Sequence, residues 1–399
     1  MIFCTYWFIV SIAFIVPLYL VARTQAMRFL ILMLFCFIFH SHFAGPAGVL
    51  PIVVLAALTY STGRSKNKTA CLAGIALCVL SLIFYKYLTF FAHQASNLFF
   101  PTALKSTESA ITRILPGAPP LAISFFTFEF VHYLYEVRRG HEPIKSLKDF
   151  AQFTFFFPSL VAGPIKRYEQ FIPSFHAGLN CISSSDVATG LLRVMVGLFK
   201  KLLIADNLTA YINATDPRFA FLPMTERWVL LGAIALRIYM DFSGYTDMAL
   251  GLAQMIGIKL PENFNWPYLA QNIQQFWQRW HMSLSSWIRD YVYIPLGGSR
   301  VGTARRVSNG LFAFALCGLW HGAEWNFAVW GLYHGIGLAI CSSYRTILGP
   351  IGRSIGAIFD HAPAVSRAVT ILFVGIGWLL FFYPVDKAMQ MARLLFIKA

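Results

Sequence analysis

The chain has 399 residues, of which 57% are hydrophobic and only 12% are charged. A soluble domain carries about 25% charged residues, so the composition excludes an ordinary soluble protein and indicates a polytopic membrane protein. The formal net charge is +15, but the Lys and Arg residues lie between apolar runs, as in loops that anchor a membrane protein. We therefore expect contact with membrane lipid and no nucleic-acid partner.

Apolar runs predict the membrane helices, because a helix needs about 20 mostly apolar residues to cross a bilayer. The clear runs are residues 2–22, 27–43, 49–60, 70–92, 121–137, 228–242, 310–341 and 366–383. Two runs with polar interruptions, 150–164 and 187–212, predict re-entrant or in-plane helices. The first run lacks a basic segment before it and is too long for a signal peptide, so we expect it to be retained. The sequence predicts an all-α fold with about nine to eleven membrane-embedded helices.

The basic loops predict an orientation. Short loops rich in Lys and Arg stay in the cytoplasm, and such loops occur at 23–28, 64–68 and 138–148. Each membrane span reverses the side on which the chain lies. Counting spans from these basic loops therefore places the N-terminus and the loop 93–120 outside the cytoplasm. With no visible repeat or linker, we expect one membrane domain over 1–399: N-terminal spans (1–137), basic loops and interrupted helices (138–227), a core (228–341) and a C-terminal span with a tail (342–399).

The stretch "FWQRWHMSLSSWIRDYVYIPLGGSR", residues 276–300, is unusual for a membrane protein. Taken as one helix of 3.6 residues per turn, it has an aromatic stripe made of Trp277, Trp280, Leu284, Trp287 and Tyr291. Polar faces flank that stripe, with His281 on one of them and Arg279, Ser283 and Ser286 on the other. This pattern predicts a helix that lies in the membrane interface or lines a polar cavity. A simple anchoring belt would explain it equally well.

Ionisable residues at membrane depth are costly and usually face a cavity or a partner. In "RIYMDFSGYTDMALG", Arg237 and Asp241 stand four residues apart and could pair on one helix face, and Asp247 follows. These three are candidates for a substrate route, although a structural ion pair is the simpler interpretation. The segment "LPENFNWPY", 260–268, contains two prolines and two asparagines and predicts a turn.

The segment "LCGLWHGAEWNFAVWGLYHG", 316–335, carries the histidine that we consider most important, His321. Gly318 and Gly322 could leave room for a substrate, and Glu324 would orient the imidazole if the helix continued. A satisfied core histidine is the alternative. His334 would lie about 20 Å away along one continuous helix, too far to share a substrate atom. No HxxxH, HExxH or Cys/His spacing is present, so we expect no metal ligands.

Several long motifs in one order resemble the membrane-bound O-acyltransferases. The blocks that carry the likeness are "ISFFTFEFVHYLYEVRRG", "FFPSLVAGPIKRYEQF", "DFSGYTDMALGL", "ENFNWPY", "FWQRWHMSLSSWIRDYVYIPLGG" and "GLWHGAEWNFAVWGLYHG". They are most similar to the bacterial branch typified by the alginate O-acetylation membrane protein, and more distantly to the branch that transfers D-alanine toward teichoic acids. The likeness covers most of the chain.

The resemblance implies a tunnel through a thin membrane core, with an acyl thioester donor on the cytoplasmic side and an acceptor outside. His321 falls on the histidine of the family's WHG motif, and His281 falls on the family's second conserved position, facing the donor route. The resemblance also implies no bound cofactor, a co-substrate such as acetyl-CoA or an acyl-carrier protein, and a separate extracytoplasmic transferase or acceptor protein. It places the chain in a bacterial inner membrane.

We expect transfer of an acetyl or similar short acyl group to a hydroxyl of an extracytoplasmic polysaccharide or cell-wall polymer. His321 would act as general base, because a neutral imidazole can take the hydroxyl proton as attack develops. Donors to the developing oxyanion could come from Trp320, Trp325, Asn326 or a free backbone amide. Close relatives often continue with further C-terminal segments, which leaves exopolysaccharides, peptidoglycan and teichoic acids open beside alginate. A transporter that uses Arg237, Asp241 and the histidines is the alternative, and a scaffold or receptor would not explain the polar interior.

Overall fold

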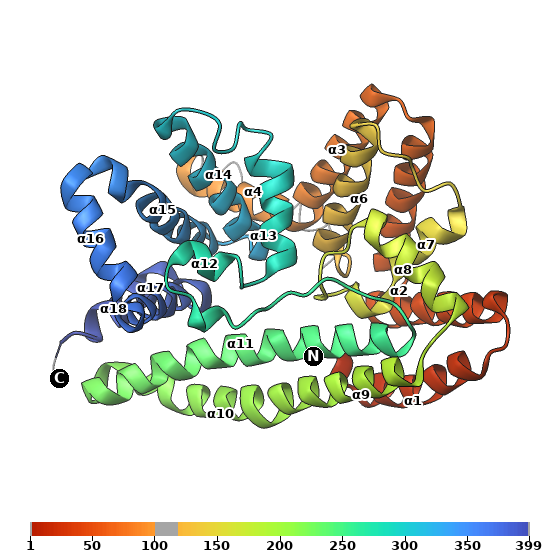
Figure 1. The fold of residues 1–399 in the computed structure, drawn as a ribbon, viewed down its shortest axis with the longest axis horizontal. Helices are drawn as coiled ribbons and strands as arrows, with labels where there is room; N and C mark the ends of the chain where they lie inside the picture. Colours follow the sequence, from red (N-terminus) through yellow and green to blue (C-terminus); the bar gives the residue numbers. More distant parts are fainter. Residues whose placement is uncertain (1, 100–118, 398–399) are drawn as a thin grey trace. The chain divides into compact units, whose positions relative to one another are not determined.

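The computed structural model describes residues 2–99 and 119–397 (Figure 1). Every regular element in these residues is helical, which confirms the all-α prediction. The described residues divide into two compact units, one formed by Met1–Gly197 and Tyr245–Pro261, the other by Leu198–Gly244 and Glu262–Ala399. The single membrane domain expected from the sequence stays a prediction.

The first unit is built around long apolar helices. Its α-helices are α1 (Tyr6–Val21), α2 (Gln25–Ser65), α3 (Lys68–Leu82), α4 (Leu88–Phe99), α6 (Ile123–Arg138), α7 (Leu147–Phe155), α8 (Tyr168–Asn180), α9 (Ser184–Leu198) and the last turns of α11 (Met224–Met255). A π-helical segment, Ile83–Tyr87, joins α3 to α4. Helix α6 packs against α2 and α3, and α7 and α8 pack against α2 (Figure 1).

The second unit contains the motif histidines. Its elements are a π-helical segment (Phe199–Ala205), α10 (Asp206–Thr215), the first part of α11, α12 (Ile273–Trp277), α13 (Met282–Ile288), a π-helical segment (Arg289–Tyr293), α14 (Thr303–His321), α15 (Trp325–Ile347), α16 (Gly349–His361), α17 (Pro363–Phe382) and α18 (Val385–Leu394). Short 3₁₀ turns occur at Ile2–Cys4, Phe157–Ser159, Asp216–Phe221 and Pro267–Leu269. Helix α15 packs against α12, α14, α16 and α17.

Three helical stretches of the described residues are long and apolar enough to cross a membrane: Gln25–Ser65, Lys68–Ala95 and Pro363–Phe382. The shorter helix α1 is also apolar. Apolar side chains are exposed along α9 and the π-helical segment after it, among them Leu192, Met195 and Leu203. Exposed apolar surface of this extent is expected where lipid replaces water. The chain is therefore a multi-pass membrane protein.

The predicted runs 27–43 and 49–60 are the two arms of one kinked helix, α2. Gly45 has a φ of +65°, and Pro46 follows it. Glycine adopts this left-handed conformation without the clash that a Cβ atom would cause, and proline cannot donate the next helical hydrogen bond. The kink therefore lies where the sequence separates the two runs.

The predicted single run 310–341 is wrong, because it is two helices. Helix α14 ends at His321, and α15 begins at Trp325. The two helices pack closely, since a Cβ atom on Gly318 would lie 2.1 Å from the carbonyl oxygen of Phe327, and one on Gly331 would lie 2.1 Å from that of Phe314. Gly318, which we expected to make room for a substrate, instead lets two helix backbones meet, and a Cβ atom on Gly322 would lie 2.1 Å from the ring of Phe327.

The predicted helix through 276–291 is also wrong as a continuous element. Helix α12 ends at Trp277, α13 begins at Met282, and His281 between them has a left-handed φ of +44°. The segment 260–268 contains no α-helix, as predicted, and ends in a 3₁₀ turn. For the predicted outer loop 93–120, residues 93–99 continue α4 and 100–118 lie outside the described residues.

Candidate active site

The backbone between α12 and α13 is held by the irregular segment that precedes α12. The amide of Met282 donates to the carbonyl of Asn263, and the amide of Asn265 donates to the carbonyl of Arg279. These two bonds bracket His281, whose left-handed conformation costs a non-glycine residue about 1–3 kcal/mol. Such strain persists only where neighbouring structure compensates for it, so the segment fixes the position of this histidine.

The Asn263 side chain then determines how the His281 ring is protonated. Its Oδ1 accepts hydrogen bonds from the amide and the hydroxyl of Ser283, at 3.2 and 2.8 Å. A backbone amide can only donate, so the atom facing it is the oxygen of Asn263. Nδ1 of His281 lies 3.2 Å from the same oxygen and must therefore carry the proton. In the neutral ring the lone pair is then on Nε2.

Nε2 of His281 is buried and makes no hydrogen bond with the described residues. The residue is 1% exposed, and neither of the short helices that flank it spans a membrane. Burial lowers the pKa of His281 well below its usual range, and the nearby His321 lowers it further. The ring is therefore a neutral base with a free lone pair.

His321 lies at the C-terminal end of α14 inside a set of aromatic rings. Its ring centroid is 4.7 Å from that of Trp320, 5.3 Å from Trp330 and 5.1 Å from Phe381. All three contacts are edge-to-face. Trp320 also meets the ring of His281, at 6.1 Å. The structure therefore brings together the two histidines that the sequence predicted, with Trp320 touching both.

The aromatic stripe predicted for 277–291 is buried. Its members, Trp277, Trp280, Leu284, Trp287 and Tyr291, are each 9% exposed or less. The ring of Trp280 stacks on Phe276 at 5.6 Å and contacts Trp378 at 4.9 Å. Trp277 and Trp280 therefore lie in the hydrophobic core of the second unit, and the burial of all five side chains argues against an anchoring belt.

Arg237 and Asp241 do not pair with each other. Asp241 forms an ion pair at 2.7 Å with Lys201 of the π-helical segment, which also holds Asp206 at 2.6 Å. Nε of Arg237 donates to Thr209 at 3.2 Å. Helix α10 and its π-helical neighbour thus supply partners for both residues, and the ion pair between Arg237 and Asp241 that the sequence allowed does not form.

The remaining predicted residues have different surroundings. Asp247 belongs to the first unit, where it pairs with Arg193 at 3.1 Å. Glu324 is exposed at the N-terminus of α15, so the helical geometry that would have aimed it at His321 does not exist. Asn326 is buried in the first turn of α15, and Arg279 is partly exposed with its carbonyl accepting the Asn265 amide.

His334 is a core histidine. It is fully buried, and its ring lies 5.0 Å from Trp330 and 5.2 Å from Trp277. The expectation of about 20 Å to His321 assumed one continuous helix and does not hold, because α14 and α15 fold back on each other. Trp330 instead contacts both histidine rings.

Sequence reasoning missed Asn263, Trp330 and Phe381 as parts of the site. Asn263 lies in the segment that we interpreted as a turn, and the family likeness of "ENFNWPY" was the available signal in the sequence. Its side chain is completely buried. A cavity of about 640 Å³ lies beside α12, α15, α16 and α17, lined by residues such as Gln274, Cys341 and Phe373. Neither His281 nor His321 lines it, so we do not assign acyl transfer to it.

Comparison with known proteins places the chain in a family. Residues 138–350 match the membrane-bound O-acyltransferase family. The chain is 39% identical over 314 residues to a probable alginate O-acetylase of Azotobacter vinelandii, covering 77% of this chain and 58% of that protein. It is 33% identical to the peptidoglycan O-acetyltransferase of Helicobacter pylori, covering 77% and 60%. It is 31% identical to the teichoic acid D-alanyltransferase of Bacillus subtilis, covering 68% and 75%.

The chain spans less than two thirds of the length of the alginate and peptidoglycan relatives. It spans 75% of the length of the teichoic acid relative. The family match covers both histidines, the α14–α15 pair and the Asn263 segment. The family predicted from the motifs is thus confirmed: this chain belongs to the membrane-bound O-acyltransferases.

Proposed function

We propose that the protein moves an acetyl or similar short acyl group from a thioester donor to a hydroxyl of an extracytoplasmic polymer. The donor is acetyl-CoA or an acyl-carrier protein on the cytoplasmic side, and the protein lies in the bacterial inner membrane with its N-terminus outside. Family membership supports the reaction type. The three relatives are named for three different polymers, so the proposal covers the class of acceptor and does not choose among its members.

In the proposed reaction the acceptor oxygen attacks the thioester carbonyl carbon. His321 takes the hydroxyl proton, the C–S bond breaks, and the thiol leaves with a proton, so that thioester and alcohol become ester and thiol. A positioned base typically contributes 10²- to 10⁴-fold to such a reaction. Three aromatic rings pack against His321, whose side chain remains partly exposed, so a substrate can reach it.

The observation that carries the proposal is the pair of histidine rings joined by Trp320, one of them with a free lone pair. A lone pair without a partner does not by itself mark a functional histidine, because both ring nitrogens of the core residue His334 also lack one among the described residues. His281 differs from His334 because Asn263 holds its Nδ1 and because its ring lies beside Trp320 and His321. With Asn263 bound to Nδ1, the Nε2 atom of His281 is able to accept a hydrogen bond from a substrate. We assign His281 to the donor side of the site and His321 to the acceptor hydroxyl.

We further propose that a separate extracytoplasmic transferase or acceptor protein receives the acyl group. The transporter alternative loses support, because Lys201 pairs with Asp241 and Arg193 pairs with Asp247. The two carboxylates that suggested a solute route are thereby accounted for by local ion pairs, and Arg237 by its hydrogen bond to Thr209.

The test is reconstitution into liposomes with a thioester donor on the cytoplasmic side and polymer outside. We expect donor consumption that depends on His321 and efficient polymer acylation only after an extracytoplasmic partner is added. Solute uptake without donor cleavage would contradict the enzyme, and efficient acylation by this chain alone would contradict the two-component scheme.

A further inference from the structure

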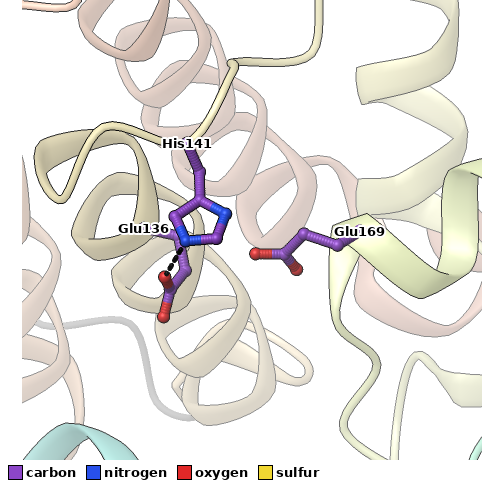
Figure 2. A group of neighbouring side chains, drawn as sticks. All are labelled: Glu136, His141 and Glu169. Carbon is purple, nitrogen blue, oxygen red and sulfur yellow. Dashed lines mark ion pairs between the residues drawn. The ribbon is translucent and has the colours of Figure 1, made fainter.

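Two groups of residues outside the histidine pair could bind a ligand, and ion pairs explain the first of them. In the first unit, Glu136 and His141 pair at 3.4 Å, and the Glu169 carboxylate points from α8 toward both side chains (Figure 2). Glu169 lies 3.2 Å from His132, and Arg139 lies 3.7 Å from Glu136. Each carboxylate thus already faces a nitrogen atom, and no bound ion is needed to explain this group.

The second group lines the cavity of about 640 Å³ in the second unit. The cavity lies among α12, the C-terminal half of α15, α16 and the first half of α17. Helix α17 is long and apolar enough to cross a membrane. Three apolar residues that line the cavity, Ile340, Leu348 and Val369, are also exposed. The cavity therefore opens on apolar surface of the kind that lipid covers in a membrane protein.

One end of the cavity, which we call the apolar end, is formed by Gly337 of α15 and Phe373 of α17. A Cβ atom on Gly337 would lie 2.5 Å from the Phe373 ring, so the glycine keeps these two helices close. Ser366 and Thr370 also line the cavity, but each hydroxyl donates to a backbone carbonyl at 2.7 Å. Because both hydroxyls are already bonded, this wall behaves as an apolar surface toward a ligand.

The other end, which we call the charged end, is formed by Arg345 and Asp360. Arg345 lies about 12 Å from Gly337 along the axis of α15, at a rise of about 1.5 Å per residue. Its Nη2 donates to both carboxylate oxygens of Asp360, at 2.7 and 2.9 Å, and its Nε donates to the Tyr344 hydroxyl. Nη1 makes no hydrogen bond with the described residues. The two charged side chains are 49% and 57% exposed, so a ligand can reach both.

The two ends follow the polarity of a membrane leaflet. Asp360 precedes the apolar helix α17, which begins at Pro363, whereas Phe373 lies near the middle of that helix. The charged end therefore lies at the level of the membrane interface, and the apolar end lies at the depth of the hydrocarbon. Between the two ends, α12 passes beside Cys341 and carries the exposed amide side chain of Gln274. Charge, amide and apolar wall thus follow one another in the order of a phospholipid headgroup, its ester groups and its acyl chains.

We propose that this cavity binds a glycerophospholipid with a zwitterionic headgroup of the phosphoethanolamine type. One acyl chain lies between α15 and α17, and the Gln274 amide donates to an ester carbonyl. The phosphate accepts from Nη1 of Arg345, since the planar guanidinium suits phosphate oxygens, and the ammonium pairs with Asp360. A headgroup with a phosphate and no ammonium would bring a second negative charge to Asp360, which is unfavourable. The inference rests on the cavity and is independent of the acyl-transfer proposal.

The test is native mass spectrometry of the full chain, purified in detergent, delipidated and then mixed with one defined lipid at a time. Phosphatidylethanolamine should be retained at one equivalent. Phosphatidylglycerol should be retained roughly threefold less, the effect of one exposed ion pair, and diacylglycerol, which lacks a phosphate, should be retained least. Thermal melts in the same lipids give a second readout, because a ligand that binds the folded protein raises its melting temperature. These comparisons use the unaltered protein and need no variant.

Two variants locate the site. Val369→Trp places an indole in the cavity and should weaken retention of phosphatidylethanolamine roughly tenfold or more, since each displaced methylene costs a factor of about four. Leu372→Trp is the matched control, because Leu372 is an exposed residue of the same helix that does not line the cavity. Arg345→Gln should lower retention to the level of diacylglycerol. Arg353→Gln removes an exposed arginine of α16 outside the cavity and should bind as the unaltered protein does.

Three results would overturn the proposal. Equal retention of the three lipids by the unaltered protein would show that the headgroup is not recognised. Retention of detergent alone would show that the cavity holds any alkyl chain. Undiminished retention in a folded Val369→Trp protein would show that the lipid binds elsewhere.

Discussion

Oδ1 of Asn263 lies 3.2 Å from Nδ1 of His281 and also accepts both hydrogen bonds of Ser283. The carbonyl of the same asparagine accepts the amide of Met282. The main chain of Asn263 thus fixes the backbone next to His281. The side chain of Asn263 determines which nitrogen of the His281 ring carries the proton. These two roles can be separated by mutation.

Asn263→Ala should lower acyl transfer by roughly 10- to 100-fold while the protein still folds. The backbone bond to Met282 remains, but Nδ1 loses its acceptor and the ring can change tautomer or rotate, so part of the base's contribution is lost. Donor turnover against pH measures this, because a positioning role alters the pH profile whereas a purely structural role lowers only the amount of active protein. Asn265→Ala is the control, since that side chain is exposed, and equal losses in both variants would contradict the assignment.

His321→Ala should abolish acyl transfer, with a loss of roughly 100-fold or more, and should leave insertion and yield near normal. The base is removed while the surrounding rings can still pack on one another. Product formation per folded protein measures the effect. His361→Ala, which removes an exposed histidine of α16, should remain active. Near-normal turnover without His321 would exclude it as the general base.

Gly318→Ala should destabilise the protein, because the added Cβ atom would lie 2.1 Å from a backbone oxygen of α15. Overpacking of this kind costs about 1–3 kcal/mol, so we expect a lower melting temperature and a lower folded yield. Gly310→Ala lies on the same helix with nothing within 4 Å of the new Cβ atom, and it should fold at least as well as the unaltered protein. A stable but inactive Gly318→Ala protein would instead support the original interpretation of this glycine as room for substrate.

Cysteine labelling in a cysteine-free background should separate two serines of α13. Ser286→Cys is partly exposed and should react with a membrane-impermeant reagent from the cytoplasmic side. Ser283→Cys should not react, because that position is buried against Asn263. Labelling of Ser286→Cys only from the outside would reverse the proposed orientation and remove the basis for a cytoplasmic donor.

Asp241→Asn should lower stability and leave acyl transfer per folded protein nearly unchanged. Its carboxylate pairs with Lys201, and both side chains are partly buried, so loss of the charge weakens a local tie between α11 and the π-helical segment. A thermal melt and a turnover assay together measure this. A large loss of turnover at normal stability would instead indicate that Asp241 has a functional role.

The sequence by itself determined the all-α membrane fold and the family, and it predicted the two histidines as site residues, because apolar run length and long ordered motifs are local properties of the chain. It could not determine where helices break. The left-handed turn at His281 depends on hydrogen bonds from the 263–265 segment, and the turn after His321 depends on α14 packing against α15. Only the tertiary structure decided that Asn263 orients His281, that Lys201 rather than Arg237 pairs with Asp241, and that Glu169 reaches Glu136 and His141. The physical reason is that such contacts join residues distant in sequence, whose spacing along the chain carries no signal of their proximity in space.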